Sequence, residues 1–161
     1  MIKKSIKLLL VLVVVSLLMS FGLSDSTSVK CMIQLKNYKG EGAYIVVSVL
    51  DVEDNYIKTL RILGDDEEWY PDLEEWYPNY EANNSMVDGI TGATIKGGER
   101  SIFSLAIDAE LIDKGNILRF ETAVEDQKYI IDDVRIPLNR ESLKGKYQGS
   151  EYIRYVKLLS R

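Results

Sequence analysis

Hydrophobic alternation with a period of two constrains the fold of this chain more than any other feature. In residues 30–35, Cys31, Ile33 and Leu35 alternate with the side chains between them. Similar runs rich in β-branched residues, separated by polar turns, follow at 43–52, 56–63, 101–107, 117–124 and 127–134. Such alternation places successive side chains on opposite faces of a strand. The sequence therefore predicts an all-β protein, an antiparallel β-sandwich of immunoglobulin-like type.

Two segments near the C-terminal end are less regular. Residues 136–138 include Pro137, and proline cannot donate a hydrogen bond to a β ladder. This segment is therefore predicted to form an edge. Residues 152–159 fit either a last strand or a short terminal helix, and periodicity alone does not choose between them.

The N-terminal residues have the pattern of an export signal. Lys3, Lys4 and Lys7 precede an apolar run at 8–18 that is short for a membrane span, and small residues at Ser20 and Gly22 allow cleavage. We expect a signal peptide at 1–22, a spacer at 23–28 and a single sandwich domain at 29–161. The protein should then be exported, periplasmic or extracellular, with no membrane span after cleavage. An uncleaved N-terminal anchor is the alternative.

Composition excludes several classes of function. The formal net charge is −5, and loss of the signal would leave 17 basic and 25 acidic residues, which argues against nucleic-acid binding. The chain has no His, so catalytic triads and His-ligated metals are excluded, and an enzyme acting alone is not expected. Its one Cys, Cys31, allows no internal disulfide and is either a core thiol or an interchain bridge.

The segment 64–100 interrupts the strand pattern as a long inserted loop. It contains Glu-Glu-Trp-Tyr-Pro twice, with both tryptophans of the chain, Trp69 and Trp76. Loops of this length are often functional. The structural interpretation is that the tryptophans pack over one end of the sandwich while the acidic residues stay solvated. A calcium site at 65–68 is a weaker hypothesis, because the ligand spacing of a calcium-binding loop is missing.

The run at 87–94 follows directly: Val-Asp-Gly-Ile-Thr-Gly-Ala-Thr. As a local structure it predicts a turn, because Asp-Gly is a strong turn dipeptide and Asp or Thr side chains cap nearby amides. The side chains of Gly92 and Ala93 are small, so the backbone of this segment could also fit into the active-site cleft of a modifying enzyme.

Two stretches together resemble a family of bacterial periplasmic proteins, domain of unknown function 2271. One is the strand–turn–strand at 44–60 with Gly64 and Trp69, and the other is the run at 87–94 with Gly98 and the strand after it. The resemblance implies an exported β-sandwich associated with extracytoplasmic flavin and iron-reduction systems.

The run at 88–94 also resembles the covalent attachment motif for FMN in extracytoplasmic flavoproteins, in which an Asp lies six residues before the modified Thr or Ser. The resemblance implies that Thr94 is the acceptor and Asp88 its partner, with Thr91, Gly92 and Ala93 between them. A flavin transferase would make the bond. Lys96 or Arg100 could then pair with the phosphate, and the aromatic side chains of the loop could stack on the isoalloxazine: Trp69, Trp76, Tyr70 and Tyr77.

Two functions of different classes follow. The first is an exported, flavin-associated redox accessory protein that carries FMN at Thr94 for electron transfer with membrane redox proteins. The alternative is a non-catalytic binding or structural module of the cell envelope that uses the Trp-rich 64–100 loop as its contact surface.

Overall fold

A computed structural model describes residues 25–83 and 90–160. The predicted signal peptide and Asp88 lie outside these residues. The described strands follow the predicted alternation closely: β1 (Ser26–Leu35), β2 (Tyr44–Leu50), β3 (Tyr56–Leu63), β4 (Thr91–Gly92), β5 (Arg100–Asp108), β6 (Ile117–Ala123), β7 (Ile130–Pro137), β8 (Lys146–Gln148) and β9 (Ile153–Ser160).

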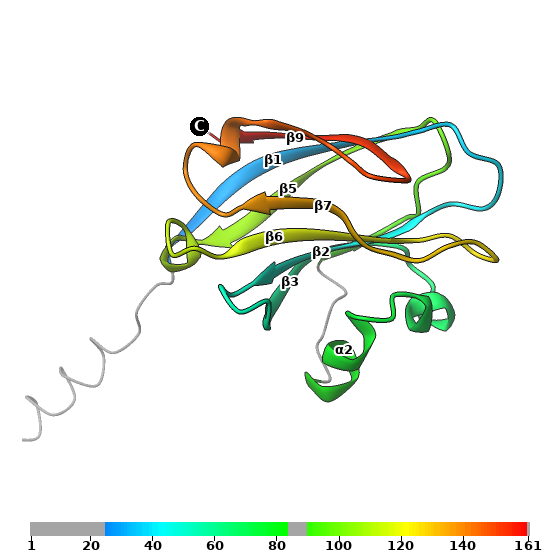
Figure 1. The fold of residues 1–161 in the computed structure, drawn as a ribbon, viewed down its shortest axis with the longest axis horizontal. Helices are drawn as coiled ribbons and strands as arrows, with labels where there is room; N and C mark the ends of the chain where they lie inside the picture. Colours follow the sequence, from blue (N-terminus) through cyan, green and yellow to red (C-terminus); the bar gives the residue numbers. More distant parts are fainter. Residues whose placement is uncertain (1–24, 84–89, 161) are drawn as a thin grey trace, which may run out of the picture.

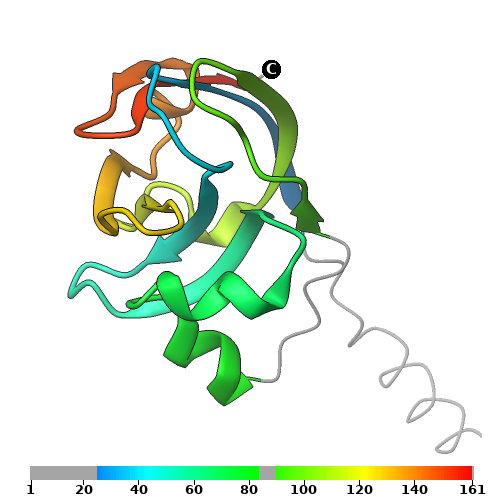
Figure 2. The same ribbon diagram turned by 90° about the vertical axis from the view of Figure 1, so that its right-hand side faces the viewer.

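The strands form two packed sheets, which Figure 1 shows as two layers and Figure 2 shows end-on. The four-stranded sheet has the order β5-β1-β9-β8, and the five-stranded sheet has the order β4-β3-β2-β6-β7. All pairings are antiparallel except that of β3 with the two-residue β4. The prediction of an all-β sandwich is confirmed.

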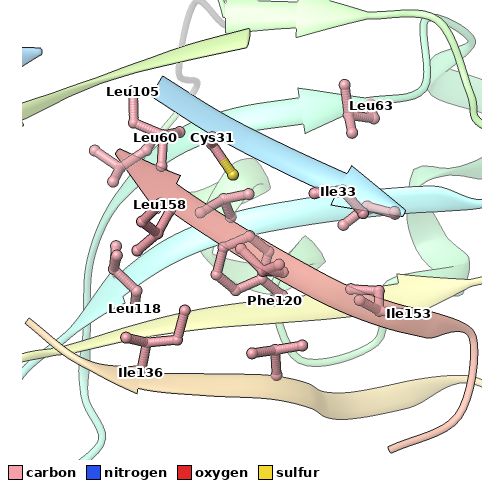
Figure 3. Close-up of a cluster of buried hydrophobic side chains, with 14 of the residues drawn as sticks. Cys31, Ile33, Leu60, Leu63, Leu105, Leu118, Phe120, Ile136, Ile153 and Leu158 are labelled. Carbon is pink, nitrogen blue, oxygen red and sulfur yellow. The ribbon is translucent and has the colours of Figure 1, made fainter. Parts of the chain in front are cut away.

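The main core lies between the two sheets. In β1, Val29, Cys31, Ile33 and Leu35 are all fully buried, as the period of two predicted. They meet residues of both sheets, including Phe120, whose ring lies in the middle of the cluster (Figure 3). This burial of apolar side chains is the main force that holds the layers together.

A second apolar cluster lies on the outer face of the five-stranded sheet. Two short helices, η1 (Glu67–Asp72) and α2 (Tyr77–Asn83), cover this face, as Figure 1 shows for α2. Their buried side chains pack on the sheet residues, and together they form the outer-face cluster: Val46, Ile62, Tyr70, Leu73, Trp76 and Ala123. Residues 67–83 of the inserted loop therefore cover this part of the sheet face and do not form a cap at one end of the sandwich.

The structure corrects one expectation about segment ends, decides a second and confirms a third. β1 begins at Ser26, because β5 extends to Asp108 and pairs with it, so residues 26–28 belong to the strand and not to the spacer. The segment after 152 is the strand β9 and not a helix, because it pairs with β1 along nearly its whole length. Pro137 does lie in an edge strand, β7.

Two further 3₁₀ turns complete the described elements: η3 (Ala109–Leu111) and η4 (Ser142–Lys144). Within the described residues, no helix combines the length and apolar character needed to cross a membrane.

Candidate functional site

Thr94 lies on a groove beside η1, at one end of the five-stranded sheet. The groove consists of two adjoining cavities of about 160 and 320 Å³ that share part of their lining. The shared lining is Trp69, Asp72, Ala123 and Glu125. The first cavity adds Glu41, Gly42, Tyr44 and Thr94, and the second adds Glu74, Val124, Asp126, Gln127 and Tyr129.

Backbone hydrogen bonds on both sides fix the position of Thr94. Ile95 and Ala43 exchange two hydrogen bonds, with N···O distances of 2.7 and 3.2 Å. On the other side, the amide of Gly64 donates to the carbonyl of Gly92 over 2.5 Å. Ile95 itself is buried in the core. The half-buried Thr94 side chain is thus held at the groove by the sandwich framework.

Gly42 gives Thr94 the room it occupies. A Cβ at this position would lie 2.4 Å from the Thr94 Oγ1, closer than real contacts allow. This close approach could not be predicted from the sequence, because the two residues belong to segments about 50 positions apart.

The local sequence of η1 places Trp69 on the groove. Asp66 caps the helix through its side chain, which accepts a hydrogen bond of 3.0 Å from the Glu68 amide. Tyr70 turns inward, is 1% exposed, and donates its hydroxyl to the Gly64 carbonyl. With Tyr70 anchored, the neighbouring Trp69 is left half-buried on the groove wall.

Trp76 lies elsewhere. Its indole is fully buried in the outer-face cluster and donates from Nε1 to the Thr59 Oγ1 over 2.7 Å. The ring stacks on Tyr80 and meets Tyr70 edge to face. As folded, Trp76 has no surface to offer a ligand. Of the four aromatic residues that the sequence suggested for stacking, Trp69 is the one that lines the groove; Tyr44, from β2, lines it too and was missed.

The other predicted residues that the structure describes do not line either cavity. Thr91 and Gly92 form β4 and are half-buried, and Ala93 is exposed. Lys96 and Arg100 are exposed and do not line either cavity. They have local partners: the Lys96 amide donates to Glu99, and the Arg100 Nε donates to the Gln34 side chain.

The groove is electronegative. Among the described residues that line it, none is basic and five are acidic. The acidic residues are Glu41, Asp72, Glu74, Glu125 and Asp126. Burial raises the pKa of Tyr44 above its usual value, and Asp66 and Asp65 raise it further. The Tyr44 hydroxyl therefore stays protonated. No group of three or more potential ligands among the described residues is arranged to hold a metal ion.

A buried polar network ties the η1–α2 region to the sheet beside the groove. Arg119 and Glu121 form an ion pair of 2.6 Å on β6, and both are almost inaccessible to solvent. The Tyr129 hydroxyl donates to the other Glu121 oxygen over 2.7 Å and accepts from the Glu75 amide. Burial raises the pKa of Glu121, although Tyr129 and Arg119 both act to lower it. The pair is therefore costly to bury and held together by its partners.

A family model described as "Predicted periplasmic protein (DUF2271)" matches residues 26–155. The chain belongs to this family. The match begins at the first residue of β1 and ends within β9, so it spans both sheets and every residue of the groove. A search of the curated proteins and a search of the solved structures found no match to the chain.

Membership of the DUF2271 family confirms the resemblance to this family that the stretches at 44–69 and 87–98 indicated. The family description also confirms the predicted location, since it places such proteins in the periplasm, outside the cytoplasm. The description names a place and no reaction, so the chemistry of the groove has to be argued from its residues.

Proposed function

We propose that this protein is an extracytoplasmic flavin carrier, with FMN joined through its phosphate to the Thr94 hydroxyl by a flavin transferase. One observation carries the proposal: Thr94 shares a cavity with Trp69 and Tyr44, two aromatic side chains from different elements. The residue that the motif singles out as acceptor is thus next to aromatic rings suited to a flat, largely apolar ligand.

The residues of the groove fit the ring system better than the phosphate. Trp69 and Tyr44 would hold the isoalloxazine, and FMN bound there would supply one- and two-electron transfer. Acidic side chains line the same cavity, and they disfavour a phosphate inside it. The phosphate joined to Thr94 would therefore need a partner outside the acidic lining, and the exposed Lys96 is the basic residue that could supply it.

The acidic lining also has a consequence for electron transfer. Glu41, Asp72 and Glu125 would oppose any build-up of negative charge on the ring. A site of this kind favours a low reduction potential, which suits a carrier that passes electrons onward to membrane redox proteins. The protein would tune and present the cofactor, and would not be an enzyme by itself.

The test is the intact mass of the exported protein after co-expression with a flavin transferase. Wild type is expected to gain the mass of one FMN less one water. Thr94→Ala is expected to gain nothing. Thr94→Ser is the matched control, because it keeps a hydroxyl at the same position and should still be modified. Folded wild-type protein that gains no mass beside an active transferase would overturn the proposal, and so would modification of Thr94→Ala.

A binding module is the second candidate, and the acidic lining is the observation that favours it. A groove with five carboxylates, an indole and no basic side chain among its described lining residues fits a cationic ligand or a basic segment of an envelope protein. Trp69→Ala with Asp72→Asn should then abolish capture of the partner in a cross-linking pull-down. If the variant captured the partner as well as wild type does, the groove would not be the contact surface. Trp76 is unsuitable for this test, because its replacement would disturb the fold.

A further inference from the structure

The outer face of the four-stranded sheet carries a concentration of basic side chains. Lys30 on β1, Arg100 on β5, Lys146 on β8 and Lys157 on β9 are all exposed. The strand neighbours of Lys30 and Lys157 are buried in the core. Strand register brings them together: Lys146 pairs directly with Lys157, and Lys157 pairs with Met32 on β1. We call these four residues the basic face. No described element lies over it in Figures 1 and 2.

Acidic residues are scarce within the strands of this face. The strands β1, β8 and β9 contain no acidic residue, and the acid in β5, Asp108, forms an ion pair with Lys58. None of the ion pairs between described residues involves the basic face. In a protein of net charge −5, the charge is therefore divided between an acidic groove on one sheet and a basic surface on the other.

Apolar side chains stand exposed among these lysines. Ile102 is 54% exposed and Leu159 is 42% exposed. Ile102 pairs across the strands with Met32, and Leu159 pairs with Lys30. Tyr155 adds an aromatic ring to the same face, with the Lys146 ammonium 4.0 Å from its centre. The face thus has isolated apolar side chains between charged groups that lie at the ends of long aliphatic chains.

We propose that the basic face docks the protein on an anionic phospholipid surface. Lysine and arginine heads would contact the phosphate layer, while Ile102 and Leu159 would enter it shallowly. Like-charged neighbours such as Lys146 and Lys157 repel one another in the free protein, and anionic headgroups would relieve this repulsion. The net charge of −5 alone would argue against attraction to an anionic membrane. Because the charge is segregated between the two sheets, that argument does not apply to this one face.

Docking in this way sets the orientation of the molecule. The groove with Thr94 is built on the other sheet and on η1, so it would stay open on the side away from the lipid. This inference does not depend on the flavin proposal. A lipid-docked carrier and a lipid-docked binding module would both present the same groove.

The experiment is co-sedimentation of the exported protein with vesicles of phosphatidylcholine, with and without phosphatidylglycerol. The face variant is Lys30→Gln with Lys157→Gln. The charge-matched control is Lys114→Gln with Lys128→Gln, two exposed lysines in turns outside the four-stranded sheet. All three proteins share the same N-terminal segment, so any effect of that segment on vesicle binding is common to them.

Wild type and the control are expected to bind phosphatidylglycerol vesicles, more weakly as salt is raised. Each lysine near an anionic surface strengthens binding about fivefold, so the face variant should lose at least tenfold in partition. Ile102→Ser should weaken binding while leaving the salt dependence unchanged.

Three results would overturn the proposal. The first is equal binding with and without phosphatidylglycerol, and the second is an equal loss in the face and control variants. The third is absence of lipid binding together with self-association in sedimentation velocity that the face variant abolishes, which would assign the face to a second copy of the chain. Thermal unfolding of each variant checks that the fold is intact.

Discussion

At the scale of single residues, burial decides what Cys31 can do. The sequence allowed a core thiol or an interchain bridge. The structure places Cys31 in the main core with no exposed surface, and burial raises the pKa of its thiol from 9.0 to about 12. The thiolate is the reactive form of cysteine, so the folded protein holds this thiol in an inert state.

Cys31 should therefore resist alkylation in the native protein. At pH 8, a thiol of ordinary pKa is roughly one-tenth ionised, whereas the buried thiol is ionised at about one part in ten thousand. Labelling by iodoacetamide, followed by mass, should be at least a hundred times slower without urea than with it. Because the folded pKa is raised, stability should also fall as the pH rises from about 9 towards 12. Rapid labelling of the folded protein would contradict this account.

At the scale of elements, alternation predicted the long strands well and the covering segment poorly. Residues 67–83 contain Pro71, Pro78 and many acids, which are typical of a loop. A signal for the fold was nevertheless present. Tyr70, Leu73 and Trp76 recur at intervals of three, near the period of a 3₁₀ turn, and all three are buried on the sheet. The three-residue strand β8 was missed because it is too short to show alternation.

The candidate site was predictable only in part, for a related reason. The sequence identified Thr94 and Trp69, which the fold brings to one groove. It could not identify Tyr44, Gly42 or Glu125, because the groove joins segments that are far apart in the chain. Trp76 has the same local sequence as Trp69, and the difference between the two comes from which of them meets Thr59 and the face of the sheet.

The two tryptophans should respond differently to truncation. Trp76→Ala removes a fully buried indole and its hydrogen bond to Thr59, and should lower the free energy of unfolding by about 3–5 kcal/mol. Trp69→Ala alters a half-buried groove residue and should lower the free energy of unfolding by about 1 kcal/mol or less. Urea denaturation followed by circular dichroism measures both. Similar losses for the two variants would mean that the repeats are structurally equivalent, contrary to the packing described above.

At the scale of the whole molecule, Asp133 joins the two sheets. It lies on β7 of the five-stranded sheet and is 2% exposed. Its carboxylate accepts four hydrogen bonds from the β8–β9 turn and the start of β9: the Ser150 hydroxyl and the amides of Glu151, Tyr152 and Ile153. A buried carboxylate with this many donors is a strong structural contact.

Asp133→Asn should destabilise the protein by about 2–4 kcal/mol, because an amide nitrogen would face amide donors that then lack an acceptor. Its neighbour provides the control: Asp132→Asn changes an exposed ion pair with Arg135 and should cost less than about 1 kcal/mol. Chemical denaturation should still show a single transition for both variants. If the Asp133→Asn variant lost structure in only one of the two sheets, Asp133 would not be what couples their unfolding.

The pairing of β1 with β9 has a consequence for when the protein folds. The earliest and latest of the described strands lie side by side in the middle of their sheet, and Val29 is the register partner of Ser160. Contacts so distant along the chain are made late and slowly. A ribosome or an export channel that has released only the first strands has therefore not released a molecule able to close its sandwich. Such a chain cannot complete its four-stranded sheet until β9 has emerged as well, so the topology itself delays folding until that strand has been translocated.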